Sequence, residues 1–212
     1  MNNKLVFWIG ILGVSLFVLA SIIGGFQFDN YDPISQYISE TMAVDTPYGQ
    51  KLRYFGYIPS GILLTIFSFA ALQKFPNSKL IKIGFCGIGI FYGIATIMVG
   101  IFPCDKGCNP EFINPSISQI IHNLTGMLTY LFVPICIIII GVGLRQLNNF
   151  ERLSKIAIIF GLISIVFIGL LFDNPSSNHA GLYQRIVETI FVFWIIICAV
   201  AIKNKVPGGN RV

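Results

Sequence analysis

The two histidines of this chain, His122 and His179, are the residues whose type most directly suggests chemistry. Two imidazoles and one carboxylate, for which Asp105 is a candidate, would hold a catalytic zinc ion with one open position. The same histidines, each beside a carboxylate, could instead exchange protons with a substrate. Neither histidine lies in a diagnostic motif such as His-Glu-x-x-His, so the residues leave both zinc and acid–base chemistry open.

Three polar segments carry the remaining candidates. Residues 32–40 begin with Asp-Pro, which is typical of a helix start, and predict a short amphipathic helix. Residues 114–126 and 179–188 also predict helix starts, with polar side chains at helical spacing. The candidates for one tentative polar pocket are Ser35, Ser39, Glu40, His122, His179, Gln184 and Arg185.

Two of these segments also have a structural interpretation, which the sequence leaves open. The 32–40 helix could simply lie at a membrane surface with a capped end. Arg185 and Glu188 are three positions apart, so they could form an ion pair along their helix, with His179 in a loop.

Cys104 and Cys108 lie four positions apart in a turn punctuated by proline and glycine. In an oxidising compartment, two such thiols predict a disulfide. A zinc site is the less favoured alternative, because this spacing is not a standard zinc motif and the chain has no second cysteine pair. Cys86, Cys136 and Cys198 lie in apolar runs and are expected to serve in packing.

The composition identifies the medium in which these residues act. The chain has 212 residues, 55% apolar and 11% charged, with a mean hydropathy of +0.78. Soluble domains carry about 25% charged residues, so a soluble globule is excluded, as are disordered, collagenous and coiled-coil chains. The sequence therefore predicts a polytopic membrane protein.

Charged residues divide the chain into six apolar stretches, each near the roughly 20 residues that a membrane-spanning helix needs. The expected spans are approximately 5–27, 54–73, 83–103, 118–144, 156–172 and 185–202. We expect one all-α bundle over residues 1–212, with a short interfacial helix after the first span. The first stretch is longer than the apolar region of a signal peptide, so a retained span is favoured over a cleaved one.

Lysine and arginine accumulate on the cytoplasmic side of membrane proteins, and this rule orients the chain. With both termini in the cytoplasm, the basic residues on that side are Lys4, Lys74, Lys79, Lys82, Arg145, Arg152, Lys155, Lys203, Lys205 and Arg211. Those outside are Lys51, Arg53, Lys106 and Arg185. The pI of 9.0 then reflects topology in a cell membrane, so the expected partner is the lipid bilayer and not nucleic acid.

In this orientation the long connections, both histidines and nearly all the acids lie outside. Ser118, His122, Thr125 and Thr129 form one polar stripe, which must face the bundle interior. We therefore expect the polar segments to converge on one outward-facing pocket, with His122 in contact with residues 35–40 or 184–185.

The same segments resemble a family of six-helix membrane proteins, the domain of unknown function 998. The matching segments are 34–40 (Ile-Ser-Gln-Tyr-Ile-Ser-Glu), 102–108 (Phe-Pro-Cys-Asp-Lys-Gly-Cys), 122–126 (His-Asn-Leu-Thr-Gly) and 181–185 (Gly-Leu-Tyr-Gln-Arg). Members commonly read Ser-Glu-Leu-Gly-Ala where this chain has Ser-Glu-Thr-Met-Ala at 39–43. The resemblance implies a bacterial or archaeal integral membrane protein and supplies no activity.

The outward-facing serines, acids and histidines are more distantly similar to membrane hydrolases related to alkaline ceramidase. Those proteins use three metal-binding histidines and seven spans, whereas this chain has two histidines and six expected spans. Three functions remain open. The first is an enzyme acting on a lipid or lipid-linked substrate, for which zinc is a candidate cofactor. The second is a small transporter, and the third is a structural or partner-binding scaffold. Haem held by the two histidines is a further, less favoured alternative.

Overall fold

Six helical segments are long and apolar enough to cross a membrane, in a computed structural model that describes residues 1–204. They are α1 (Asn3–Gly25), α2–η2–α3 (Gly49–Leu52, Arg53–Tyr57 and Ile58–Ala71), α4–η3–α5 (Lys79–Ile88, Gly89–Ile94 and Ala95–Ile101), α6 (Ile117–Arg145), α7 (Glu151–Asp173) and α8 (Ala180–Lys203). Two short 3₁₀ helices, η1 (Ile38–Met42) and η4 (Lys106–Cys108), lie in connections, and the described residues contain no strand. The predicted all-α, multi-pass membrane architecture is confirmed.

The local sequence explains several helix boundaries and irregularities. The Asn2 side chain accepts a hydrogen bond from the Leu5 amide at 2.7 Å, and the Ser116 hydroxyl accepts one from the Gln119 amide at 3.1 Å. These side chains satisfy amides that have no partner within the first turn of a helix. Pro59 cannot donate a backbone hydrogen bond, and the wider π-helical turn of η2 directly precedes it.

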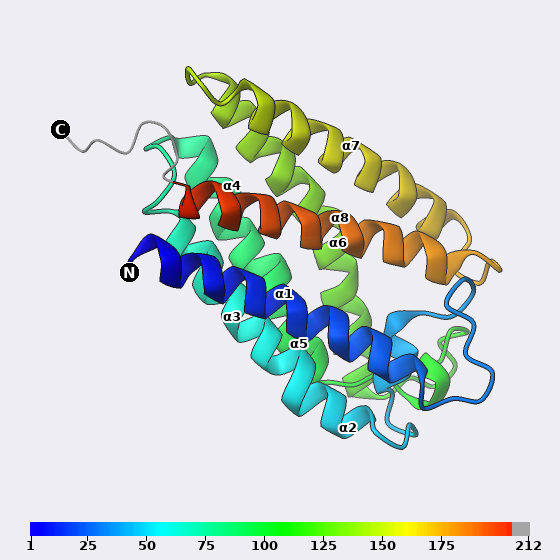
Figure 1. The fold of residues 1–212 in the computed structure, drawn as a ribbon. Helices are drawn as coiled ribbons and strands as arrows, with labels where there is room; N and C mark the ends of the chain where they lie inside the picture. The colour runs from blue at the N-terminus through cyan, green and yellow to red at the C-terminus, as the bar shows by residue number, and fades with distance from the viewer. Residues whose placement is uncertain (205–212) are drawn as a thin grey trace.

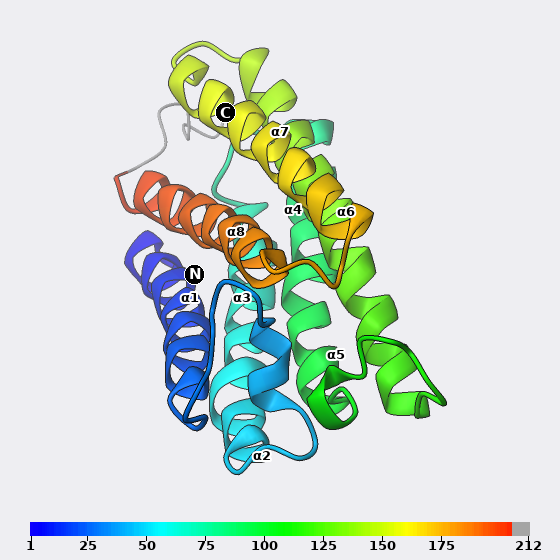
Figure 2. The same cartoon turned by 90° about the vertical axis from the view of Figure 1, so that its right-hand side faces the viewer.

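Each helix packs against two or more others, as Figures 1 and 2 show. α6 contacts α4 and α7, α1 contacts α3 and α8, and α7 contacts α8. The start of α1 meets the end of α8, where the Asn3 side-chain amide donates to the Ile202 carbonyl at 2.8 Å.

The two ends of the bundle differ in their connections. The end that holds the start of α1 and the end of α8 also carries the short connections 72–78 and 146–150, and is called the terminal end. The opposite end carries the long connections 26–48 and 102–116 together with 174–179, and is called the loop end. Lys205 and Arg211, which contribute to the orientation argument, lie outside the described residues.

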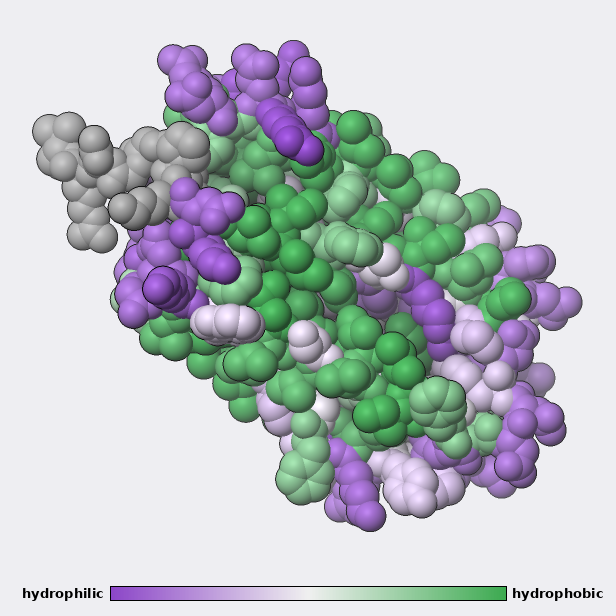
Figure 3. Space-filling model, viewed as in Figure 1, coloured by the Kyte–Doolittle hydropathy of each residue, from purple (hydrophilic) through white to green (hydrophobic). Residues whose placement is uncertain are grey.

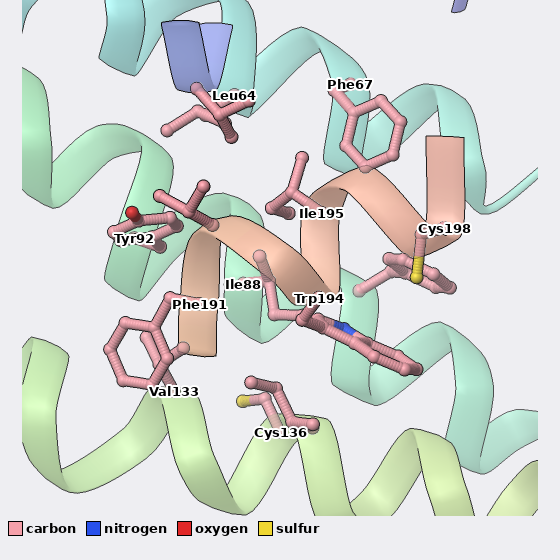
Figure 4. Close-up of a cluster of buried hydrophobic side chains, with 14 of the residues drawn as sticks. Leu64, Phe67, Ile88, Tyr92, Val133, Cys136, Phe191, Trp194, Ile195 and Cys198 are labelled. Atoms are coloured by element: carbon pink, nitrogen blue, oxygen red, sulfur yellow. The ribbon is translucent and has the colours of Figure 1, made fainter. Parts of the chain in front are cut away.

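The apolar core runs between these ends. Figure 4 shows its centre, where Trp194 and Ile195 of α8 lie among side chains of α3, α4 and α6. Trp194 is 1% exposed and Phe67 is fully buried. Large apolar side chains also cover the outside of the bundle, including Val166 at 60% exposure. Figure 3 shows this apolar surface as a green band between hydrophilic ends, as expected for a surface that lipid covers.

One sequence-based expectation about the elements is wrong. Residues 32–40 do not form one helix, because the chain turns at 33–36 and only the 3₁₀ helix η1 follows. The Asp32 carboxylate accepts from the Ile34 amide and from the Ser35 hydroxyl, which stabilises a turn at that point. The last helix begins at Ala180 and contains the expected span 185–202; its extra first turn forms where the backbone amides of Gly181 and Leu182 find carbonyl partners in the loop end.

Candidate functional site

A cavity of about 720 Å³ lies at the loop end of the bundle. Its walls come from segments far apart in the sequence: residues 35–42, the third span, the first half of α6, and α8. Of the candidate residues, it is lined by Ser35, Ser39, Glu40, His122 and Gln184. The structure therefore gathers five of the seven candidates around one space.

Glu188 is the most deeply placed carboxyl group of this cavity. It lies eight residues after the start of α8, about 12 Å along the helix axis, and is 8% exposed. Tyr130 of α6 donates a hydrogen bond to its Oε1 at 3.0 Å, and Tyr92 of η3 donates one to its Oε2 at 3.2 Å. Each carboxylate oxygen thus has a phenol partner, and the side chain borders the cavity.

The position of Tyr92 depends on an unusual segment of backbone. Tyr92 belongs to η3, a π-helical segment within the third span, and a π-helical turn shifts the side chains that follow it around the helix axis. Gly93 packs directly on the backbone of Thr65, so any larger residue would push the third span away from α3. Gly93 therefore serves close packing and also fixes the approach of the Tyr92 phenol to Glu188.

Arg185 makes contacts different from those expected. Its Nη1 donates to the carbonyl oxygens of Pro33, Gln36 and Gly181 at 2.6–3.0 Å, and its Nη2 donates to the Tyr31 hydroxyl. Arg185 does not neutralise Glu188, so the predicted ion pair along α8 is wrong. The guanidinium instead joins the turn at 33–36 to the start of α8.

Backbone contacts reinforce this joint. The amides of Gly181 and Leu182 donate to the carbonyls of Ser35 and Ile34, at 3.3 and 2.8 Å. These amides have no partner inside α8, so the turn caps the helix. A side chain at Gly181 would strike the Gln36 carbonyl, which explains a glycine at that place. We call Arg185, the turn 33–36 and the first turn of α8 the clamp.

Gln184 and Glu40 extend the clamp toward η1. The Gln184 side-chain oxygen accepts from the Ile38 amide at 2.6 Å. The Glu40 carboxylate accepts from the Tyr37 amide at 2.8 Å and from the Gln36 side chain at 3.0 Å. Burial raises the pKa of the Tyr37 phenol to about 12, and the nearby Glu40 charge acts in the same direction. Both polar side chains therefore position backbone while they border the cavity.

His122 and Gln119 hold the 102–116 connection against α6. His122 Nδ1 lies 2.9 Å from the Phe102 carbonyl oxygen, and the ring is 7% exposed. The Gln119 side chain accepts from the Asp105 amide at 2.6 Å and donates to the Cys108 carbonyl at 3.2 Å. His122 lines the cavity beside Gly126 and Thr129 of the same helix.

The three residues proposed as zinc ligands are not brought together. His179 is exposed at the start of α8, where its ring lies parallel to Tyr183 with the ring centres 6.1 Å apart. The Asp105 carboxylate accepts from the Ser116 amide at 2.9 Å and from the Ser116 hydroxyl at 2.5 Å. These hydrogen bonds lower the pKa of Asp105 and end the 102–116 connection at α6. His122 alone of the three borders the cavity.

Cys104 and Cys108 are joined by a disulfide in the structure, with their Cα atoms 4.8 Å apart. Within residues 1–204, the one set of three potential metal ligands that lie close together is these two cysteines with His122, whose ligand atoms are within 4.8 Å of one another. Because the disulfide occupies both sulfurs, this set offers one free imidazole and does not fit a zinc ion. The other three cysteines are buried or half-buried in the spans.

A second space, of about 780 Å³, lies between α1 and α8. Val18 and Ile22 of α1 and Val192 and Phe193 of α8 form its apolar walls. Of the two candidates that do not line the cavity, Arg185 borders this groove and His179 borders neither space. We call this second space the α1–α8 groove.

Sequence reasoning missed the centre of the site. Glu188 was interpreted only as a partner of Arg185, and Tyr92 and Tyr130 were not singled out. The available signal was a carboxylate inside an apolar stretch, since an ionisable residue in a span is a functional candidate by default. Tyrosines within the third and fourth spans were the matching donors.

Comparisons with known proteins agree with the resemblance of the motifs. The search of curated proteins and the search of solved structures found no match. The family model described as "Protein of unknown function (DUF998)" matches residues 11–201, which include all six spans in whole or in large part. The chain therefore belongs to the DUF998 family of membrane proteins.

Proposed function

We propose that this protein is a membrane-embedded enzyme that acts on a lipid or lipid-linked substrate in an outward-facing polar pocket, with Glu188 as its acid–base group. The observation that carries the proposal is the Glu188 carboxylate itself. It is buried in a span, its hydrogen-bond partners are two phenols, and it borders both the cavity and the α1–α8 groove. Burying a carboxylate costs several kcal/mol in such a place, so its retention favours a role in binding or catalysis.

The surroundings of Glu188 suit proton transfer. The two phenols fix the carboxylate orientation and leave its cavity side open to a bound molecule. A hydroxyl or amine of a substrate within hydrogen-bond distance of Glu188 could give a proton to it or receive one. His122, which also lines the cavity, is a second group able to exchange a proton.

The distribution of basic residues supports the outward orientation of the cavity. The loop end carries four of the basic residues, Lys51, Arg53, Lys106 and Arg185, and the other basic residues within 1–204 belong to the terminal end. An excess of lysine and arginine marks the cytoplasmic side, so the loop end and its cavity face outward.

A non-enzymatic function is the second candidate, and a specific observation favours it. Arg185, Gln184 and Glu40 use their polar atoms on backbone partners, as parts of a scaffold would. A small transporter would also need a polar cavity that reaches a carboxylate inside a span. Both alternatives keep the cavity but predict that its ligand leaves chemically unchanged.

An incubation with total polar lipid extract of the expression host separates these functions. Purified protein in nanodiscs is mixed with the extract, and bound and free lipids are analysed by mass spectrometry. The proposal predicts that the wild-type protein depletes one lipid species and forms a product, and that Glu188→Gln does not. Glu151→Gln, the same change at the terminal end, is the matched control and should behave as wild type.

The other outcomes are equally informative. A lipid that is retained by the wild-type protein, unchanged, and lost in Glu188→Gln would replace the enzyme with a binding protein or transporter. Equal behaviour of wild type and Glu188→Gln would contradict a functional role for Glu188 altogether.

A further inference from the structure

The cavity and the α1–α8 groove meet at three residues. Phe17, Ile38 and Glu188 line both spaces. Glu188 therefore lies where the cavity at the loop end meets the groove between α1 and α8. A molecule with a polar head at Glu188 has a path for an attached hydrocarbon tail.

The charged residues that line the cavity determine whether it binds a cationic or an anionic headgroup. Its acidic lining residues are Glu40 and Glu188, and within residues 1–204 no lysine or arginine lines it. Glu40 is engaged by the Tyr37 amide and the Gln36 side chain, and it belongs to the clamp. Two carboxylates without a basic side chain repel an anionic group and attract a cation, most strongly where water is excluded.

Aromatic rings give the cavity a second means of attracting a cation. Phe17, Tyr57, Tyr92 and Tyr130 all line it. The Phe17 ring centre is 5.5 Å from that of Tyr57 and 6.2 Å from that of Tyr92, so three of the rings form one cluster. Aromatic faces bind ammonium groups, and clusters of such rings favour alkylated ammonium groups in particular.

The groove supplies a site for a tail. Its apolar walls include Val18 at 37% exposure and Phe193 at 51% exposure, so it is reached from the side of the bundle that lipid covers. Arg185 lies at the end of the groove near Asp29 and Tyr31. Its Nη1 is already engaged by three carbonyls, and its Nη2 by the Tyr31 hydroxyl, which makes it a weak competitor for a headgroup.

We infer that the ligand of this site is a single amphiphile whose ammonium head binds at Glu188 and whose hydrocarbon tail leaves through the α1–α8 groove into the bilayer. This inference rests on the proposed function and names its substrate class. Glu188 and the aromatic cluster hold the head, and the tail enters from the membrane without crossing water.

The test uses probes of known chemistry on the full-length protein in nanodiscs. Dodecyltrimethylammonium, kept below its micelle concentration, carries the head and the tail, tetramethylammonium carries the head alone, and dodecyl phosphate carries the tail with an anionic head. Binding is measured by calorimetry, with empty nanodiscs subtracted. The inference predicts that dodecyltrimethylammonium binds and that dodecyl phosphate binds at least about tenfold more weakly.

Two pairs of variants assign the head and the tail. Glu188→Gln should weaken the binding of dodecyltrimethylammonium about tenfold, whereas Glu151→Gln should leave this binding unchanged. Thr189→Phe fills the groove from an exposed position, so it should weaken the binding of dodecyltrimethylammonium and leave the binding of tetramethylammonium unchanged. Val166→Phe, on the exposed face of α7, controls for the added ring.

The results distinguish this inference from the proposed function. The amphiphile inference would be overturned if dodecyl phosphate bound more tightly than dodecyltrimethylammonium, or if Thr189→Phe did not change the binding of the tailed probe. Glu188-dependent turnover of host lipids would in that case still support an enzyme. Loss of turnover in Glu188→Gln without any Glu188-dependent binding of the ammonium probes would overturn the inference in the same way. Absence of every Glu188-dependent signal would overturn both.

Discussion

Arg185 and Glu188 are one helical turn apart on α8, yet their surroundings are opposite. The Arg185 guanidinium is engaged by three backbone carbonyls of the clamp and by the Tyr31 phenol. The Glu188 carboxylate meets two side-chain hydroxyls and the open cavity. The clamp uses polar groups to fix the loop end, whereas the cavity keeps one polar group available.

This difference separates residues that build a site from residues that act in it. Both kinds are polar, and Arg185 and Glu188 both lie in the first half of α8. Only the partners of each side chain distinguish them, because a hydrogen bond to backbone positions a segment and an open carboxylate can meet a ligand. Changes at four places in the chain test this difference.

Replacing Arg185 should have the largest effect on stability. Arg185→Met removes charged hydrogen bonds to the carbonyls of Pro33 and Gln36, each of the kind that contributes about 1.5–3 kcal/mol. We expect the free energy of unfolding in detergent to fall by about 3 kcal/mol. Arg152→Met, at the terminal end, is the control and should change it little. A clamp variant as stable as the wild type would contradict the structural role.

Breaking the Cys104–Cys108 disulfide should have a smaller effect. The loop it closes is short, so its removal by Cys104→Ser with Cys108→Ser should cost about 2 kcal/mol at most. Mass spectrometry of unreduced protein should find the peptide with both cysteines two hydrogens lighter than its reduced form. Alkylation of both thiols without reductant would refute the bridge.

Replacing Glu188 should alter stability least among the buried changes. Glu188→Gln keeps an acceptor for a tyrosine and removes a buried charge, so the melting temperature should stay the same or rise slightly. A large loss of stability would instead assign Glu188 to the framework, like Arg185. Measured beside Arg185→Met, this variant tests the contrast between the clamp and the cavity.

Asp105, in the 102–116 connection of the loop end, should make a pH-dependent contribution to the stability of the protein. The Ser116 amide and hydroxyl lower the Asp105 pKa from its ordinary value of 3.8. Stability from this carboxylate is therefore present above that pH and is lost as the pH falls through the lowered value.

Asp105→Asn should accordingly be less stable than wild type at neutral pH, and the difference should shrink below pH 3.8, as followed by thermal melting. Asp173→Asn, at the exposed end of α7, controls for the loss of one charge. A difference that stays constant with pH would exclude the ionised carboxylate as its source.

The fold was largely predictable from the sequence because the length and apolarity of a stretch of residues identify a membrane-spanning helix. The all-α class followed from composition, and a helix start was expected within 114–126, although its cap is Ser116 and not the Asn114–Pro115 pair. The turn at 33–36 did not follow from the sequence, because Asp32 can begin either a helix or a turn, and the choice depends on the amide and guanidinium donors that α8 provides to the carbonyls of the turn.

The site was predictable only in part, for a similar reason. Spacing along α6 placed His122 on an inward face, and the polar segments reached one cavity. Spacing along α8 suggested an Arg185–Glu188 pair, but Arg185 found partners 149 or more residues away in the chain. Periodicity reports which residues share a helix face, and it does not report what another segment brings to that face.

The cavity should open to the outside of the membrane, and labelling of one introduced cysteine measures this orientation. Gly126 lines the cavity with no atom near the place of a side chain, so Gly126→Cys fits there. Intact cells are treated with a membrane-impermeant maleimide, with the wild-type signal subtracted and Gln146→Cys at the terminal end as the matched control. Gly126→Cys should react in intact cells, and Gln146→Cys should react only after permeabilisation. The reverse pattern would contradict the outward-facing cavity.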